Sequence, residues 1–211
     1  MMIDKFKKVL IKYGPLIFGQ KFYGKWFYNA INDDNLRSHP VIAEELVTHF
    51  KPSYVLDFGC GDGTLLYELK NKGVAGVGYE YSDCGIELCR GRGVEVVKFD
   101  FTERIRPVFM KNVDIVISLE VAEHLLEMHA DFYCECLSKY NDAKVLFFTA
   151  ARVGQTGEGH VNEQPPEYWE AKFGGLGWRK EKEMTEKLRL SLEKKGVSWY
   201  YWQNLQIFNR A

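Results

Sequence analysis

The stretch VLDFGCGDGT at residues 55–64 decides the fold of this chain. Its first half is a short apolar run typical of a buried strand, and Gly59, Gly61 and Gly63 follow at alternate positions before a helical pattern begins. A tight turn needs one or two glycines. Because glycine has no Cβ, three of them indicate that a group from outside the chain comes very close to the backbone at this turn.

The composition is that of an ordinary globular protein and limits the partners to expect. The 211 residues are 46% hydrophobic and 27% charged, which predicts one domain with a substantial core. The formal net charge of −1 offers no basic field, so neither nucleic acid nor a membrane is expected as a partner. The five cysteines lack a zinc-like spacing and fit reduced thiols, and no segment has the apolar length of a signal peptide or a membrane span. We therefore expect a cytoplasmic protein.

Between residues 53 and 150 the sequence alternates between short β-branched strands and helices. Such alternation predicts a parallel sheet with helices covering both of its faces. A long helix is expected directly after the fourth strand, from residue 121 to about residue 140. The expected strands are residues 55–58, 74–81, 94–101, 113–119 and 145–150, and the other expected helices of this region are residues 64–72 and 84–90.

The two flanks of this region differ from it in composition. Residues 1–30 carry eight aromatic residues among lysines, a pattern that fits either an amphipathic membrane helix or a cap over the protein's own cleft. Glycines and a proline interrupt the helical periodicity there, which favours the cap. The other elements expected in the flanks are helices at residues 39–50, 167–173 and 186–195, a polar loop at 152–164 and a last strand at 197–208.

Two carboxylates are expected at the same edge of the sheet as the glycine turn, because the carboxyl ends of parallel strands lie together. Glu80 ends the second strand, 21 positions after Gly59, where a carboxylate can accept hydrogen bonds from both hydroxyls of a ribose. Asp100 ends the third strand and can bind the amino group of an adenine, with Phe101 lining the ring. Each acid alone is more typical of a helix cap, but together with the glycine turn they favour a ligand. The glycine spacing differs from that of dinucleotide sites, which disfavours an NAD oxidoreductase.

The segments VLDFGCGDGT, GVGYE, VVKFDF, DIVISLEVAEHL and KVLFFTA occur in this order between residues 53 and 150. In this combination the sequence resembles the class I S-adenosylmethionine-dependent methyltransferases. The resemblance implies a Rossmann-like fold, with a seven-stranded, mostly parallel sheet, helices on both faces and a last strand, residues 197–208, that runs antiparallel. The single domain, 1–211, would then comprise an N-terminal helical cap at 1–50, a cofactor-binding core at 53–150 and an acceptor loop with C-terminal strands at 151–211.

S-adenosylmethionine is the cofactor that the resemblance implies. Asp57 suits the ammonium group of an amino acid better than a pyrophosphate, and the motifs of the family assign Asp57 and the amides of Gly59 and Gly61 to the methionine end. The same motifs assign Glu80 to the ribose and Asp100 to the adenine. Further cofactor contacts are expected from the neighbouring residues Cys60, Tyr81, Phe101 and Glu120.

Groups for the methyl acceptor are expected after the fourth strand, where Glu120, Glu123 and His124 stand at positions i, i+3 and i+4 and would share one helical face. Acids in a first helical turn commonly complement the helix dipole, and we favour this interpretation. The alternative is a divalent metal on these three residues, completed by His160 or His129. It rests on a resemblance to the E-x-x-E-H segment of ubiquinone-pathway O-methyltransferases and small-RNA 2′-O-methyltransferases, where two glutamates and a histidine hold the ion. Without a metal, His124 is a candidate general base, and Glu120 is a further catalytic candidate.

A second polar cluster, GHVNEQPPEYW at residues 159–169, follows the fifth strand and is expected over the acceptor. It resembles a GHVN…P…YW segment of bacterial methyltransferases found among sugar and cell-surface biosynthesis proteins. His160 is its candidate catalytic residue, whereas Trp169 is expected to be structural. The cap residues that could close over the cofactor are Tyr13, Tyr28 and Arg37.

The function that the resemblance implies is transfer of a methyl group from S-adenosylmethionine to an oxygen, less so a nitrogen, of a small molecule or saccharide. Small acceptors are favoured because the chain has no appended recognition domain and no basic stripe. One alternative is a metal-assisted 2′-O-methyltransferase of RNA ends. The alternative from another class is a non-catalytic regulatory module that binds S-adenosylmethionine. The sequence leaves open the acceptor, the acceptor atom, the use of a metal and the oligomeric state.

Overall fold

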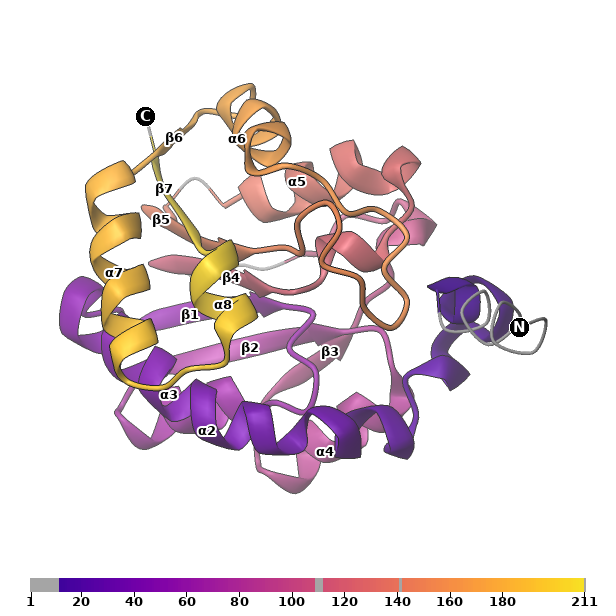
Figure 1. Ribbon diagram of the computed structural model, residues 1–211. Coiled ribbons are helices and arrows are strands. Elements are labelled where there is room, and N and C mark those ends of the chain that lie inside the picture. The colour runs from indigo at the N-terminus through magenta and orange to yellow at the C-terminus, as the bar shows by residue number, and fades with distance from the viewer. Residues whose placement is uncertain (1–11, 109–111, 141, 211) are drawn as a thin grey trace.

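The protein folds around one seven-stranded sheet that lies between two layers of helices (Figure 1). The structure is a computed structural model that describes residues 12–108, 112–140 and 142–210, and expectations for residues 1–11 lie outside them. The strand order is β3-β2-β1-β4-β5-β7-β6. The strands are β1 (Tyr54–Phe58), β2 (Ala75–Glu80), β3 (Val96–Lys98), β4 (Ile115–Leu119), β5 (Val145–Thr149), β6 (Trp178–Lys180) and β7 (Gln206–Arg210).

β1 to β5 pair in parallel with one another, whereas β7, the last strand of the chain, forms antiparallel pairs. β1 pairs in parallel with both β2 and β4, so that Leu56 lies opposite Val77 on one side and Val116 on the other. β7 runs antiparallel to both of its neighbours, β5 and β6. Helices on both faces bury the strands, which explains their near-continuous apolar runs. The predicted seven-stranded, mostly parallel sheet with an antiparallel last strand is confirmed.

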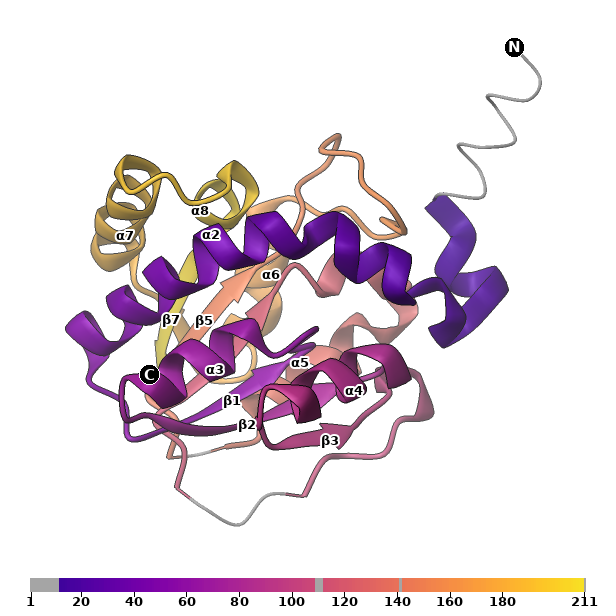
Figure 2. The same cartoon turned by 90° about the horizontal axis from the view of Figure 1, so that it is seen from below.

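Alternate residues of each strand supply two hydrophobic cores, one on each face of the sheet. Leu56 and Phe58 of β1 belong to the core under α5 and α6, whereas Val55 belongs to the core under α2, α3 and α7. Figure 2 shows α2, α3 and α4 together on one face. Among the described helices, none combines the length and the hydropathy that crossing a bilayer requires. The helices are α2 (Lys25–Phe50), α3 (Thr64–Asn71), α4 (Asp83–Gly91), α5 (Ala130–Ser138), α6 (Pro166–Gly174), α7 (Lys182–Lys194) and α8 (Trp199–Asn204), with the 3-10 turns η1 (Gly19–Phe22), η2 (Phe101–Glu103), η3 (Ala122–His124) and η4 (Glu127–His129).

Helix α2 begins well before residue 39, where the sequence predicts its start. It starts after Gly24, and Pro40 lies inside it. A proline in a helix interior removes one hydrogen bond to the carbonyl four residues earlier. The helix continues because Ile42 and Leu46 are completely buried in a hydrophobic core shared with α3 and α7, which holds its second half in place. From residue 12 on, the N-terminal cap is therefore mostly one long helix.

The segment after β4 is not the long helix expected at residues 121–140. It consists of the two short turns η3 and η4, and α5 begins only afterwards. Leu125, at the end of η3, is extended with ψ of 134°. The backbone carbonyl of Glu123 accepts hydrogen bonds from the amides of Val161 and Asn162, at 2.9 and 3.0 Å. These bonds to a distant loop use a carbonyl that a continuous helix would need, so tertiary contacts override helical propensity.

The prediction of a last strand at residues 197–208 is wrong for the first part of this range, which forms helix α8. The aromatic residues there have high strand propensity, but contacts with α2 decide their structure. The amide of Ser198 donates to Oγ of Ser38 at 3.0 Å, and the hydroxyl of Tyr201 donates to the Asn35 side chain at 3.0 Å. The sequence also did not predict the three-residue strand β6, which lies at the edge of the sheet.

Candidate functional site

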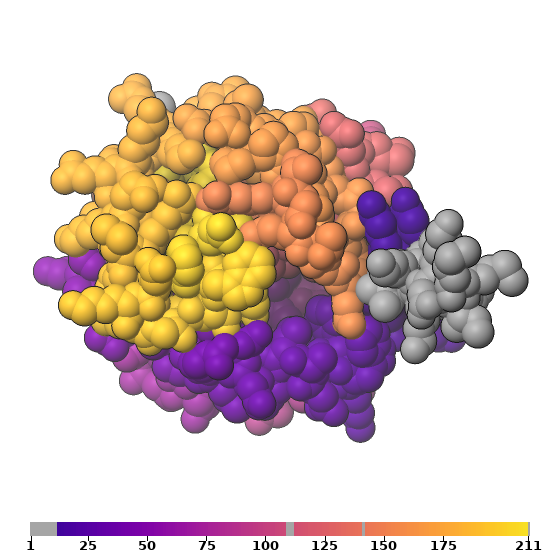
Figure 3. Space-filling model, viewed as in Figure 1, coloured from indigo at the N-terminus to yellow at the C-terminus, as the bar shows by residue number. Residues whose placement is uncertain are grey.

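The carboxyl ends of the parallel strands open into one cavity of about 520 Å³. This volume lies within the range of small-molecule sites. In the space-filling view a hollow is visible where α2, α8 and the loop after β5 meet (Figure 3). Pro15 and Tyr23 of the N-terminal segment line the cavity, so this segment caps it as the sequence predicts.

The glycine turn after β1 has a left-handed backbone at all three glycines, with φ of 76°, 59° and 75°. A Cβ on Gly59 would lie 2.3 Å from the Val121 side chain, so packing inside the protein requires this glycine. A Cβ on Gly61 would meet only Tyr28, at 3.8 Å, and Gly61 lines the cavity. Both Gly59 and Gly61 line the cavity, but packing against Val121 already requires a glycine at position 59, whereas at position 61 only the positive φ does.

The amides of this turn already have acceptors inside the protein. Those of Gly59 and Cys60 donate to the carbonyl of Tyr79, at 2.7 and 3.2 Å. The Gly61 amide donates to a carboxylate oxygen of Glu80 at 2.8 Å. A cofactor could share the amides of Gly59 and Gly61 only through bifurcated hydrogen bonds.

Glu80, at the end of β2, is a buried carboxylate that ties two segments together. Its Oε2 accepts from the Gly61 amide and its Oε1 from the Ser82 amide, both at 2.8 Å, and the Tyr28 hydroxyl lies 3.5 Å from Oε1. Burial raises the pKa of Glu80 to about 7, although these hydrogen bonds favour the charged form. Glu80 also lines the cavity, where a carboxylate retains acceptor capacity for further donors.

Asp57, near the end of β1, and Asp100, just after β3, lie on either side of Glu80, and both line the cavity. Burial, together with the charges of Glu80 and Asp62, raises the pKa of Asp57 to about 8. Asp100 accepts hydrogen bonds from the amide and the hydroxyl of Thr102, both at 2.7 Å, and so caps η2. The capping interpretation is therefore correct for Asp100, and the same residue also forms part of the cavity wall.

The neighbouring residues expected to contact a cofactor, Cys60, Tyr81 and Phe101, also line the cavity. Phe101 is only 6% exposed, and its ring packs edge-on against Tyr133 with 4.9 Å between centroids. Most of Phe101 therefore belongs to the core, and Tyr81 is the more open of the two rings.

Glu120 lies in the cavity wall directly after β4 and has a left-handed φ of 53°. Its two carboxylate oxygens accept hydrogen bonds from the Asn204 side chain, at 3.1 and 3.2 Å. Burial raises the pKa of Glu120 to about 7, against the hydrogen bonds from Thr149 and Asn204. The prediction that Glu120, Glu123 and His124 share one helical face is wrong, because the chain turns at Glu120 and then forms only a short 3-10 turn.

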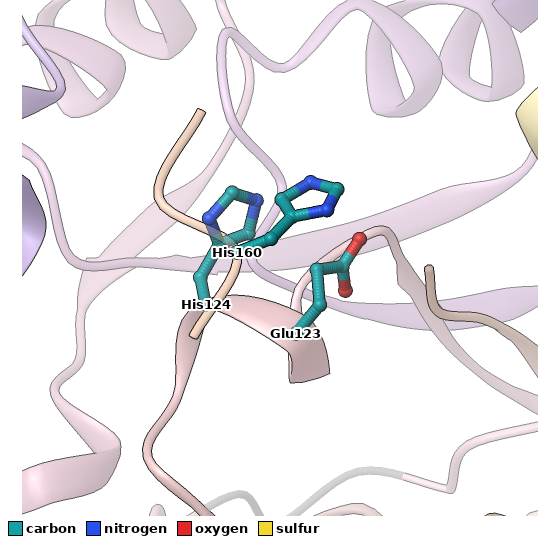
Figure 4. Close-up of side chains that lie close together, drawn as sticks. All are labelled: Glu123, His124 and His160. Carbon is teal, nitrogen blue, oxygen red and sulfur yellow. The ribbon is translucent and has the colours of Figure 1, made fainter. Parts of the chain in front are cut away.

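Glu123, His124 and His160 instead form a compact cluster (Figure 4), in which one ligand atom of each lies within 4.8 Å of the others. Both carboxyl oxygens of Glu123 and Nδ1 of His124 are buried without a hydrogen-bond partner among the described residues. One carboxylate and two imidazoles fit a divalent transition metal. Glu120 does not belong to this cluster, and His160, rather than His129, is its third member.

His160 is oriented by Glu163. Nδ1 of His160 lies 3.1 Å from Oε1 of Glu163, and because a carboxylate only accepts, Nδ1 carries the proton and Nε2 keeps its lone pair. Burial lowers the pKa of His160 despite Glu163, and burial together with His160 lowers that of His124 to about 3. Both rings are therefore neutral at pH 7, and a neutral imidazole with a free nitrogen can accept a proton.

Several cavity residues come from α2 and α8, and of these only Tyr28 was connected with the site from the sequence. Tyr28, Asn35 and His39 line the cavity at helical spacing along α2, and the aromatic side chains of α8 lie beside them. This spacing would have identified them if the helix had been predicted to begin at its true start. Of the three cap residues considered from the sequence, Tyr28 lines the cavity, whereas Tyr13 and Arg37 do not.

Comparison with known proteins identifies solved structures that share the fold of this chain. A family model described as methionine biosynthesis protein MetW matches residues 38–128, which is fewer than half of the 211 residues. No curated protein matches the sequence. The similar solved structures include mitomycin 7-O-methyltransferase MmcR, with a TM-score of 0.61 and 16% identity over 88% of this chain, which spans 56% of that protein.

Two further structures are covered almost completely by this chain. An S-adenosylmethionine-dependent methyltransferase from Archaeoglobus fulgidus has a TM-score of 0.62 and 19% identity, with 88% of this chain and 100% of that chain covered. An amino pentose methyltransferase from Micromonospora echinaspora, involved in calicheamicin biosynthesis and solved with bound S-adenosylmethionine, has a TM-score of 0.63 and 15% identity, with 88% and 97% covered. The chain therefore has the class I methyltransferase fold.

Alanine substitutions at Gly59 and Gly61 should separate backbone strain from packing. At both positions the positive φ should cost alanine about 1–2 kcal/mol of unfolding free energy. Gly59→Ala should cost more, because its Cβ would lie 2.3 Å from Val121. In urea unfolding, adding Val121→Ala should recover stability in the Gly59→Ala background and not in the Gly61→Ala background. Equal costs at the two glycines would contradict the role given to Val121.

Proposed function

We propose that this protein is an S-adenosylmethionine-dependent methyltransferase that acts on an oxygen atom of a small molecule or saccharide. The observation that carries the proposal is that Asp57, Glu80 and Asp100 line one cavity together with the glycine turn. An ammonium group, a ribose and an adenine each call for an acceptor, and the three carboxylates lie at the carboxyl ends of the neighbouring strands β1, β2 and β3 in that order. The fold shared with a structure that holds S-adenosylmethionine supports the same cofactor.

The order of the strands divides the cavity into a cofactor half and an acceptor half. β3, β2 and β1 lead to the three carboxylates, whereas β4 and β5, next in the sheet, lead to Glu120, His124 and His160. Ligands of open parallel sheets bind beyond the carboxyl ends of the strands, so cofactor and acceptor would lie side by side there. We therefore assign the acceptor to the half over β4 and β5.

The reaction is a displacement in which the acceptor oxygen bonds to the methyl carbon while the bond from this carbon to the sulfonium sulfur breaks. The electron pair of the broken bond stays on sulfur, and a hydroxyl acceptor must lose its proton. His160 takes this proton on Nε2, because Glu163 holds the other ring nitrogen as a donor. His160 is then the catalytic residue and Glu163 a positioning residue, while alignment of the two substrates supplies much of the remaining acceleration.

The charge of the cavity wall supports a neutral acceptor. Six carboxyl residues line the cavity, and among the described residues no lysine or arginine does. An acceptor rich in phosphate or carboxylate would meet repulsion without compensation, whereas a hydroxylated small molecule or a sugar would not. The wall also weighs against the alternative of RNA ends, whose phosphates call for a basic cleft. The six residues are Asp34, Asp57, Glu80, Asp100, Glu120 and Glu158.

A metal-assisted form of the same transfer is the second candidate, and the cluster of Glu123, His124 and His160 favours it. The buried atoms without partners fit a divalent cation held by one carboxylate and two imidazoles. Such an ion, when bound, polarises a hydroxyl group. His160 would then serve as a ligand, and Glu163 would orient it as outer carboxylates orient metal-bound histidines.

Removing the Glu80 carboxylate should weaken cofactor binding. Glu80→Ala is expected to lower the affinity for S-adenosylhomocysteine at least about tenfold, because hydrogen bonds to a charged group are worth roughly 1.5–3 kcal/mol. Asp114→Ala is the matched control: Asp114 also accepts two backbone hydrogen bonds, from Ser53 and Tyr54 at 2.7 and 3.0 Å, but it does not line the cavity. Calorimetric titration should show the loss in Glu80→Ala alone. An unchanged affinity would remove Glu80 from the ribose site.

The affinity for the cofactor should depend on pH through Asp57. Below its pKa of about 8 the Asp57 carboxyl is largely protonated in the free protein, and only the ionised form attracts an ammonium group. Affinity for S-adenosylhomocysteine should therefore rise from about pH 6 to about pH 8, by up to roughly tenfold per pH unit for each linked proton. Glu80, with a pKa of about 7, contributes to the lower part of this rise. Asp57→Asn should flatten the upper part, and an identical slope in this variant would refute the assignment.

The reaction itself is tested with labelled S-adenosylmethionine and mixtures of hydroxylated small molecules and sugars. We expect transfer of the label, lowered at least about 100-fold by His160→Ala and less by Glu163→Gln, with cofactor affinity unchanged in both. A chelator should leave the rate unchanged if His160 is a base, and should abolish it, with recovery on adding Mn²⁺, if the cluster holds a metal. Tight binding of S-adenosylhomocysteine without transfer to any acceptor would support the non-catalytic module.

A further inference from the structure

The N-terminal segment presents large apolar side chains to solvent at one end of the molecule. Figure 2 shows this segment, in indigo, standing out beyond the start of α2. In the helical stretch at residues 12–18, Tyr13, Leu16 and Ile17 are spaced i, i+3 and i+4 and share one face. With Phe18 and Trp26 they are 40% to 56% exposed. A group of such side chains is typical of an interaction site.

The same segment is basic. Between Asp4 and Asp33 the sequence contains lysines and no acidic residue, although the whole protein has a formal net charge of −1. Three of these lysines lie in the described part of the chain, and all three are exposed and absent from its ion pairs. The three are Lys12, Lys21 and Lys25.

The opposite side of the segment is packed against the protein, so the exposed face has a defined direction. A Cβ on Gly14 would lie 2.1 Å from the ring of Phe22, which is buried and packs edge-on against Trp26 at 5.3 Å between centroids. Pro15 lies against Gly159 of the loop after β5, where a Cβ would be 2.7 Å away. Pro15 lines the cavity, and so does Leu16, whose half-exposed side chain lies at the boundary between the cavity and the exposed face. The exposed apolar and basic face therefore lies beside the entrance of the cavity.

We propose that this N-terminal face, made of the five exposed apolar side chains and the three lysines named above, binds peripherally to the surface of an anionic lipid bilayer. Aromatic and aliphatic side chains suit the boundary between headgroups and acyl chains, and lysines are attracted by the negative surface potential. A second copy of this chain fits less well, because it would bring lysines against lysines. Bound in this way, the protein turns the cavity entrance toward the lipid surface.

The sequence-based expectation that no membrane is a partner rested on the net charge of the whole chain. This net charge conceals a basic N-terminal segment that acidic residues elsewhere balance. The sequence left two alternatives for this segment, a cap and an amphipathic membrane helix, and the structure allows both at once. One side of the segment lines the cavity, and the other side is exposed and could contact lipid.

The test is co-sedimentation of the full chain with phosphatidylcholine vesicles, with and without phosphatidylglycerol. We expect binding to the anionic vesicles only, weakened by salt. The double variant Ile17→Glu, Phe18→Glu should lower the partition coefficient at least about tenfold, since it removes apolar contact and adds negative charge. The double variant Lys12→Ala, Lys21→Ala should lower it by about fivefold for each lysine removed.

Matched controls come from α7. Leu190→Glu changes a leucine that is 65% exposed, and Lys187→Ala with Lys194→Ala removes two exposed lysines; both should bind vesicles like the wild type. Binding of S-adenosylhomocysteine shows that each variant is folded, and vesicle binding needs no acceptor, so its outcome is separate from that of the proposed reaction. Absence of binding to anionic vesicles, or equal binding by the face variants, would overturn the proposal. A dimer that Ile17→Glu, Phe18→Glu abolishes, without vesicle binding, would assign the face to a second copy.

Discussion

The hydrogen bonds that the buried carboxylate of Glu80 accepts hold together the parts of the structure on which the cavity depends. They come from the amide of Gly61 in the glycine turn and from the amide of Ser82 at the start of α4. A buried carboxylate without such donors is costly, so the turn and the helix must both be in place before Glu80 can be enclosed. Burial still raises its pKa to about 7, which means that a ligand supplying further donors would stabilise the ionised form. The same group can thus organise the cavity and still accept hydrogen bonds from a ligand.

A second constraint fixes the other half of the cavity, and it acts through the backbone. The carbonyl of Glu123 accepts two hydrogen bonds from the loop after β5, and this attachment brings His160 to His124. Glu163, which orients His160, also accepts a hydrogen bond from the Gly154 amide at 2.9 Å, so the loop is closed upon itself. The candidate catalytic groups are therefore held by contacts between segments that follow two different strands.

The sequence predicted the parts of this site that depend on local pattern. The glycine turn, Glu80 and Asp100 could be placed because a strand end, a turn and the next strand end recur at short spacing, and parallel strands bring their ends to one edge. The positive φ of Glu120 could not be predicted, because it depends on bonds to Thr149 and Asn204, which come from β5 and α8. Two predictions from local propensity were wrong because they too ignored distant contacts. One was the long helix after β4, and the other was the strand where α8 forms. In each case a contact between distant residues outweighed a preference of less than about 1 kcal/mol per residue.

The most direct test of this account is a crystal structure of the protein with S-adenosylhomocysteine. We expect the ligand along the ends of β1, β2 and β3, with its ammonium group on Asp57, its ribose hydroxyls on Glu80 and its adenine amino group near Asp100. The amides of Gly61 and Ser82 should keep their bonds to Glu80. A ligand bound outside this cavity, or in it with the ribose away from Glu80, would contradict the central claim.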